Sequence, residues 1–178
     1  MIKSPPSTSP KTLVVIFKNT QMKKSLIIIA NKLESQLVGV AGEYLVAGEL
    51  TLRGYLASIT LRNSKGIDII TSNSDATKSI SIQVKTNSDG GNSWILNKKS
   101  ENYCSDSHFY VFVAIKELGT RPSFFIVPSK VVAEFITNDH SQWLQKDKRD
   151  GSKRKDTNMR KFYDKKNIYL EKWDELKL

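Results

Sequence analysis

The alternation of apolar and polar residues over residues 79–86 (SISIQVKT) constrains the fold of this 178-residue chain more than any other feature. Successive side chains of a β-strand point to opposite faces of its sheet. The two isoleucines and Val84 therefore share one face, which we expect to lie against the core. Gln83 and Lys85 share the other face, roughly 7 Å apart. The run predicts a strand with one buried face and one polar face.

The rest of the chain alternates helical and strand-like patterns. Apolar residues recur every three or four positions over residues 33–55, which predicts a largely buried helix that ends at Gly54. A second helix is expected to begin at Pro128-Ser129, with Ser129 as its N-cap. The predicted strands are residues 56–61, 66–71, 79–86, 108–115 and 123–127. This order predicts an α/β domain, in which a central mixed β-sheet is flanked by helices.

Three regions of the chain differ in composition. Residues 1–32 are expected to be a partly disordered N-terminal extension, in which Met22 is an alternative start of the chain. Residues 33–145 hold the predicted core. Residues 146–178 are a basic segment that is expected to close the domain with a final strand or short helix. Within it, residues 146–166 contain ten Lys or Arg and four Asp or Glu, which is +6 of the chain's formal net charge of +10.

The charge and composition limit the class of protein. A net positive charge attracts polyanions such as nucleic acids, although a solvated basic surface would have the same composition. The apolar runs 13–17 and 26–30 are too short for a signal peptide or a membrane span. A single cysteine, Cys104, excludes an internal disulfide, and two histidines leave no zinc-type cluster. We therefore expect a soluble, cytoplasmic protein, with oxygen ligands for any metal.

Polar side chains on two predicted strands are expected to meet. Asp68 interrupts an apolar run, and the register that keeps both apolar faces in the core places it beside Gln83 and Lys85. Phosphodiester hydrolysis needs a metal that neutralises phosphate charge and polarises water. Asp68 would supply an anionic ligand, and the Gln83 side chain and Val84 carbonyl neutral ones. Lys85 would orient the water or stabilise the transition state. The alternative is an ordinary exposed polar strand face.

A glutamate of the first predicted helix is a further candidate for this site. The residues three and four positions from Glu43 are glycine, alanine or valine, so a counter-charge for its carboxylate has to come from elsewhere. A metal beside Asp68, or the ammonium of Lys85, would supply it. Glu49 has Arg53 one turn later and is expected to form an ordinary helical ion pair. Asp89, in a glycine-rich loop, is another candidate.

These residues resemble the PD-(D/E)XK, or restriction-endonuclease-like, nuclease superfamily over roughly residues 35–115. The layout is similar to that of archaeal Holliday-junction resolvases and small bacterial members. The resemblance is carried by Gly42-Glu43, Arg53-Gly54, Gly66-Ile67-Asp68 and Ile82-Gln83-Val84-Lys85-Thr86. It implies a restriction-endonuclease-like core and a Mg²⁺-dependent endonuclease, with Mn²⁺ as a possible substitute. The implied site consists of Glu43, Asp68, Gln83 and Lys85, and metal ligands would come from Glu43, Asp68, Gln83 and Val84.

The resemblance also implies a partner, and its departures leave a second function open. DNA is expected in preference to RNA, and related enzymes that make two cuts are often homodimers. Ile67 replaces the usual proline, and Gln83 stands where Asp or Glu is usual, which gives a Q-x-K pattern. A neutral ligand weakens metal binding. A catalytically inactive nucleic-acid-binding protein on the same fold is therefore the alternative.

Basic residues and one aromatic residue make up the predicted nucleic-acid surface. Trp94 could stack on a base, and the basic segment could contact phosphates. The alternatives are a core role for Trp94 and a solvated loop for the basic segment. Tyr103, Cys104 and His108 are expected to be packing residues. The predicted surface consists of Trp94, Lys98, Lys99, Lys153, Arg154, Lys155, Arg160 and Lys161.

Overall fold

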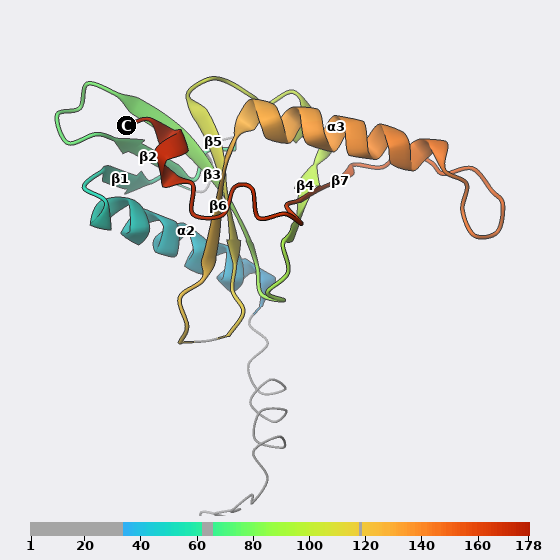
Figure 1. The fold of residues 1–178 in the computed structure, drawn as a ribbon, viewed down its shortest axis with the longest axis horizontal. Coiled ribbons are helices and arrows are strands. Elements are labelled where there is room, and N and C mark those ends of the chain that lie inside the picture. Colours follow the sequence, from blue (N-terminus) through green and yellow to red (C-terminus); the bar gives the residue numbers. More distant parts are fainter. Residues whose placement is uncertain (1–33, 62–65, 118) are drawn as a thin grey trace, which may run out of the picture. The chain divides into compact units, whose positions relative to one another are not determined.

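A five-stranded mixed β-sheet in the order β1-β2-β3-β5-β6 forms the centre of the fold (Figure 1). The structure is a computed structural model that describes residues 34–61, 66–117 and 119–178, so the predicted N-terminal extension and Met22 lie outside the described residues. β3 runs parallel to β5, and the other neighbouring strands are antiparallel. The α/β fold with a mixed sheet is as predicted. The strands are β1 (Leu56–Ile59), β2 (Ile69–Ser72), β3 (Ser79–Asn87), β5 (His108–Ala114) and β6 (Ser123–Pro128).

One helix covers the first face of the sheet because it presents a stripe of small and apolar residues. In α2 (Ser35–Leu52) the buried residues recur every four positions, and they pack over the apolar side of β3. A Cβ atom added to Gly42 would lie 1.8 Å from Thr86 Oγ1. Only glycine therefore fits where α2 crosses the end of β3. The helix ends as predicted, with Gly54 in the left-handed region at φ +85°.

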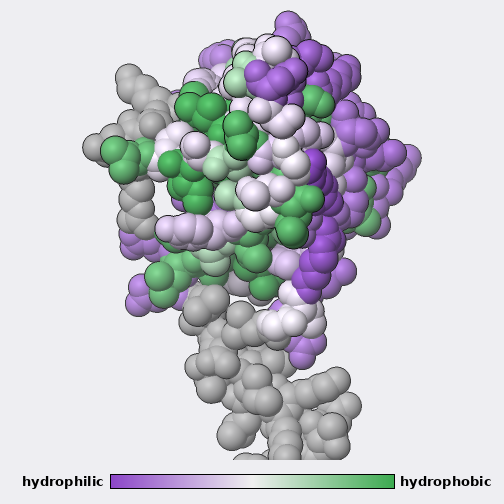
Figure 2. Space-filling model, turned by 90° about the vertical axis from the view of Figure 1, so that its left-hand side faces the viewer, coloured by the Kyte–Doolittle hydropathy of each residue, from purple (hydrophilic) through white to green (hydrophobic). Residues whose placement is uncertain are grey.

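The opposite flank of α2 is not covered by the described residues. Leu37, Tyr44 and Leu52 are 55%, 67% and 84% exposed, so the expectation of a largely buried helix is wrong. Figure 2 shows further apolar side chains, in green, on the side of the molecule where β1 and β2 lie in Figure 1. Leu56 and Ile70 are exposed members of these strands. The stripe that faces the sheet therefore accounts for the position of α2.

The second face of the sheet is covered by α3 (Ser129–Gln145) and by a two-stranded antiparallel ribbon. The ribbon consists of β4 (Ser93–Asn97) and β7 (Met159–Tyr163). Neither strand was predicted, because the two strands pair only with each other and are far apart in the sequence. β5 is buried on both faces, as its continuous apolar run predicts.

The start of α3 differs from the prediction. Its N-cap is Pro128, which makes no side-chain capping bond, and Ser129 is the first helical residue. The Ser129 hydroxyl instead accepts the N–H of Ser105 and donates to its carbonyl, both at 2.9 Å. The predicted N-cap role of Ser129 is therefore wrong: the serine ties the loop before β5 to the helix. Among the described helices, none is both long and apolar enough to cross a membrane.

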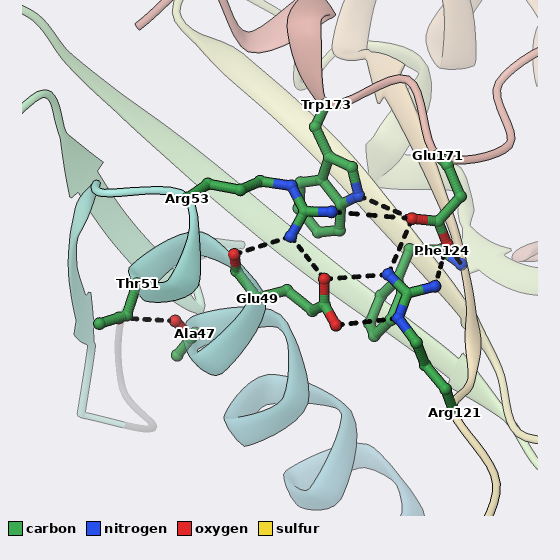
Figure 3. A network of polar contacts seen from close by, with 8 residues as sticks. All are labelled: Ala47, Glu49, Thr51, Arg53, Arg121, Phe124, Glu171 and Trp173. Carbon is green, nitrogen blue, oxygen red and sulfur yellow. Dashed lines mark hydrogen bonds and ion pairs between the residues drawn. The ribbon is translucent and has the colours of Figure 1, made fainter.

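An ion-pair network ties α2 to the C-terminal segment (Figure 3). Glu49 pairs with Arg53, as predicted, and also accepts from Arg121 at 2.9 and 3.1 Å. Arg121 donates in turn to Glu171, which lies just before the short 3₁₀ helix η2 (Trp173–Leu176). The hydrogen bond from Arg121 lowers the pKa of Glu49 despite the opposing effect of burial. Glu49 is thus a structural residue, and a short helix closes the domain as expected.

Two glycines of α2 test the close contact with β3. We expect Gly42→Ala to lower the free energy of unfolding by roughly 1–3 kcal/mol, because the new methyl group overlaps Thr86. Gly48→Ala, where no atom lies within 4 Å of the added Cβ, should raise it by up to about 1 kcal/mol through helix propensity. Urea denaturation followed by circular dichroism measures both. Thr86→Ala should recover part of the Gly42→Ala loss; equal effects of the two glycine substitutions would contradict the contact.

Candidate functional site

Asp68 lies where the chain enters β2, held against the neighbouring strand. Its N–H donates to the Ile82 carbonyl at 2.9 Å, and its Oδ2 accepts the N–H of Val84 at 2.7 Å. Val84 stands between Gln83 and Lys85 on β3. The carboxylate is therefore within one residue of both predicted partners along the strand. β2 begins at Ile69, later than the predicted start at residue 66.

Electrostatics show that Asp68 shares its surroundings with these residues. Burial raises the pKa of Asp68 above its ordinary value, while the Val84 N–H and the charge of Lys85 oppose that shift. Asp68 also helps to raise the pKa of Tyr110, which is raised chiefly by burial. Tyr110 is the partner of Gln83 in the parallel β3–β5 register. The structure thus brings Asp68, Gln83 and Lys85 together, as the sequence predicts.

The predicted helix acid is placed by the contact between α2 and β3. Glu43 follows Gly42, which packs on Thr86 from the apolar side of β3, the face opposite to that of Gln83 and Lys85. At 100° per residue, Glu43 and Glu49 emerge on opposite sides of the buried stripe of α2. Glu49 faces Arg121 and the C-terminal segment. Glu43 is half-buried on the other side of the stripe.

The donors at this place suit a hard cation. Asp68 is a carboxylate whose negative charge is disfavoured by burial, so a nearby cation would stabilise it. The Gln83 amide makes no hydrogen bond to a described residue, which leaves its oxygen available to a ligand. The N–H and C=O of a strand residue point to the same side, so the Val84 carbonyl opens toward Asp68. Within the described ranges no three His, Cys, Asp or Glu side chains gather, and the predicted set has only two carboxylates.

Two residues of the predicted nucleic-acid surface are structural. Trp94 is 2% exposed and donates its indole N–H to the Val113 carbonyl at 3.0 Å, so the prediction that it stacks on a base is wrong. Arg160 is 3% exposed, and its guanidinium bonds to the Glu101 carboxylate and to the Thr157 carbonyl. A buried guanidinium with these partners holds the ribbon in place. The prediction that Arg160 contacts phosphate is therefore wrong.

The other predicted basic residues divide into two groups. Lys98 pairs with Asp156 at 2.7 Å and Lys153 with Asp147 at 2.8 Å, whereas Arg154 lies 4.7 Å from the ring centre of Trp143. The second group is exposed and makes no ion pair with a described residue. It consists of Lys99, Lys155 and Lys161.

A pocket of about 360 Å³ opens where β3 ends, between the sheet and the ribbon. It connects Lys85 with Lys161, and it includes Asp89, which the sequence offers as a further candidate. Sequence reasoning missed the pocket because it did not predict the ribbon that forms one wall. The lining residues are Lys85, Thr86, Asn87, Asp89, Ser93, Trp94, Ile95 and Lys161.

Comparison with known proteins gives only a distant structural similarity. No family model matches the sequence, and no curated protein matches it. A solved structure of Hjc, a Holliday junction resolvase from the archaeal hyperthermophile Archaeoglobus fulgidus, is similar over 74% of this chain and 86% of its own. The TM-score is 0.42 and the sequence identity 14%. The assignment of the α/β fold rests on the strand order and packing described above.

Polar residues on β5 are buried close to the site. His108 is 3% exposed; its Nδ1 lies 2.9 Å from Ser81 Oγ, and its Nε2 has no partner among the described residues. Its ring packs on the rings of Tyr103 and Tyr110, as expected of packing residues. Cys104 is exposed, so its predicted packing role is wrong. Burial lowers the pKa of His108 to about 4.

The buried histidine predicts a pH dependence of stability. The pKa of His108 falls from 6.5 to about 4 on folding, so the unfolded chain binds more protons between these values. The free energy of unfolding should therefore decrease as the pH falls through this window, by up to about 3 kcal/mol from this residue. The raised pKa of Asp68 has the opposite effect, because the folded protein then binds the additional proton and the free energy of unfolding increases as the pH falls. Urea denaturation from pH 7 to pH 4 should show a shallower decline for His108→Gln than for the wild type; parallel curves would contradict the assignment.

Proposed function

We propose that this chain is a metal-dependent nuclease that hydrolyses phosphodiester bonds of DNA. The observation that carries the proposal is the partly desolvated Asp68 carboxylate, which the Val84 N–H holds between Gln83 and Lys85. Mg²⁺, or Mn²⁺ in its place, is the cofactor that this donor set suits. Phosphate chemistry requires a desolvated acid, a neighbouring amide oxygen and an ammonium group in one place. An ordinary exposed strand face has no need of a desolvated acid.

Each residue has a distinct role in this proposal. Asp68 and Glu43 provide the anionic ligands of the cation, and the Gln83 amide and Val84 carbonyl provide neutral ones. A bound Mg²⁺ would neutralise charge on the scissile phosphate and polarise the attacking water. Lys85 donates hydrogen bonds to that water or to a phosphate oxygen, which stabilises the negative charge that builds up in the transition state. Because only two ligands are charged, cation affinity without substrate should be low.

The proposal extends to partners and location. DNA as the preferred nucleic acid and a homodimer follow from the likeness of Gly42-Glu43, Gly66-Ile67-Asp68 and Gln83-Val84-Lys85 to that superfamily, and the single cysteine suggests a cytoplasmic location. The exposed apolar side chains of α2 support the homodimer, because such surfaces commonly mark interfaces. The chain's formal net charge of +10 supports a polyanionic partner.

The main alternative is a protein on the same fold that binds nucleic acid without cutting it. Gln83 favours it, because an amide contributes no charge to cation binding where a carboxylate is usual. Such a protein would bind DNA with a steep salt dependence and cleave none of a panel of plasmid, linear, branched and RNA substrates with Mg²⁺ or Mn²⁺. A scaffold with no nucleic-acid partner would show neither property.

Alanine substitutions test the proposed roles. We expect Asp68→Ala and Lys85→Ala each to reduce Mg²⁺-dependent cleavage at least about 100-fold, because each removes a group that contacts the cation or the reacting phosphate. Asp75→Ala and Lys78→Ala are matched controls at exposed positions near the start of β3, and they should retain activity. The measurement is the initial rate on the panel above, with circular dichroism as the folding check. Full activity in either site variant would refute the mechanism.

Replacing the proposed neutral ligand Gln83 by a charged one should strengthen cation binding. Gln83→Glu adds a carboxylate beside Asp68, so we expect Mn²⁺ affinity to rise about tenfold or more, measured by isothermal titration calorimetry. The matched control is Ser79→Glu, which places the same charge at an exposed position on the same face of β3, two alternations earlier. An equal gain in both variants would mean that the cation is not held at Gln83.

A further inference from the structure

The pocket at the end of β3 is shaped by the position of the ribbon. Trp94 and Phe162 are opposite each other in the β4–β7 register and both are buried. The next pair, Ile95 and Lys161, therefore points away from the core. Trp94 fixes the ribbon on the sheet, because its ring lies 5.0 Å from that of Phe112 and its N–H bonds to β5. Lys161 thus lines, from a rigid element, the same pocket as Lys85.

The loop that closes the pocket is held in place by its own hydrogen bonds. Asn87 donates from Nδ2 to the Gly91 carbonyl at 2.7 Å and to the Ser93 carbonyl at 3.0 Å. Asp89 Oδ1 accepts the N–H of Gly91 at 2.9 Å. These bonds connect the end of β3 to the start of β4. The pocket is thus preformed by the protein alone, which reduces the entropy lost when a ligand binds.

The polar groups of the pocket define the chemistry of its ligand. Two lysines, Lys85 and Lys161, line the pocket, and neither forms an ion pair with a described residue. The acid of the lining, Asp89, has its Oδ1 engaged by the Gly91 N–H. Two like charges that share a site favour an anion between them. Asn87 Oδ1 is buried with no partner among the described residues, so it offers an acceptor to a hydrogen-bond donor. An anion that also carries donors, such as a nucleotide unit of a nucleic-acid strand, fits both features.

We propose that this pocket binds the backbone phosphate adjacent to the scissile one, and that Lys161 is the residue that holds it. The proposal deepens the nuclease function and rests on it for the position of the scissile phosphate at Lys85. The strand would pass from Asp68 and Lys85 along the end of β3 to the ribbon. Lys161 is then a strand-binding residue that fixes which bond reaches the catalytic groups.

Binding measured without metal separates this proposal from catalysis. The probe is a fluorescein-labelled DNA oligonucleotide in EDTA, followed by anisotropy over a range of salt concentrations. We expect Lys161→Gln to weaken binding several-fold at low salt and to reduce the slope of log K against log salt by about one. Lys78→Gln removes the same charge at the opposite end of β3 and should change neither quantity. Lys161→Arg should keep both near the wild-type values.

A neutral linkage in the oligonucleotide locates the contact. In a series of oligonucleotides, each with one phosphate replaced by methylphosphonate, one position should weaken binding by the wild type. The same replacement should not further weaken binding by Lys161→Gln, because this variant already lacks the contact. The proposal would be overturned if, at every position, the affinity lost through the neutral linkage simply added to that lost through Lys161→Gln. It would also be overturned if Lys161→Gln and Lys78→Gln weakened DNA binding equally. Competition by millimolar inorganic phosphate in the wild type but not in Lys161→Gln would also overturn it, because it would indicate a free-anion site.

The outcomes also distinguish this proposal from the nuclease function. If the wild type cuts DNA but Lys161→Gln binds like Lys78→Gln, the nuclease function stands and the pocket proposal fails. If the methylphosphonate effect is found but no metal supports cleavage, the pocket binds a backbone phosphate in a protein that does not cut. Circular dichroism of the Lys161 variants excludes unfolding as the cause of lost binding, since the Lys161 side chain lies outside the core.

Discussion

The hydrogen bond between the Val84 N–H and the Asp68 carboxylate is the interaction on which the candidate site depends. At 2.7 Å it holds an acid against the backbone of β3, between two side chains that share the polar face of that strand. A carboxylate on a flexible side chain would sample many positions, whereas this one is fixed by a strand that is itself paired on both sides. Orientation of this kind is the part of catalysis that a fold can supply before any ligand binds.

The sequence predicts this part of the molecule well because the relevant signals are local. Alternation over residues 79–86 determines which side chains of β3 face the core, and the apolar run around Asp68 limits the register to one that keeps both apolar faces buried. The β4–β7 ribbon could not be predicted in the same way. Its two strands lie far apart in the sequence, and its inward residues include Arg160, whose burial depends on Glu101 more than fifty positions away. Trp94 was misjudged for the same reason, since it belongs to this ribbon and is covered by Phe112 and Phe125 of the central sheet.

The charge of the chain illustrates a related limit of sequence reasoning. Residues 146–166 carry most of the excess positive charge, but not every basic residue there is available to a ligand. Arg160 is buried against Glu101, and Lys153 pairs with Asp147. Side chains that stay unpaired among the described residues, such as Lys161, matter more for binding than the net charge does. Tertiary contacts decide which basic residues stay unpaired, and local sequence patterns do not reveal those contacts.

Two acids of the same domain show how the fold distinguishes structural from candidate functional residues. Glu49 has arginine partners that lower its pKa, and its negative charge stabilises the contact between α2 and the C-terminal segment. Asp68 is placed where burial dominates and raises its pKa, so the folded protein disfavours its charge. A purely structural acid would be expected to resemble Glu49, because an unfavourable buried charge reduces stability without any gain in packing. The Val84 N–H and the charge of Lys85 offset the effect of burial on Asp68 only in part, and a further cation would stabilise its charged form, as a metal-dependent site requires.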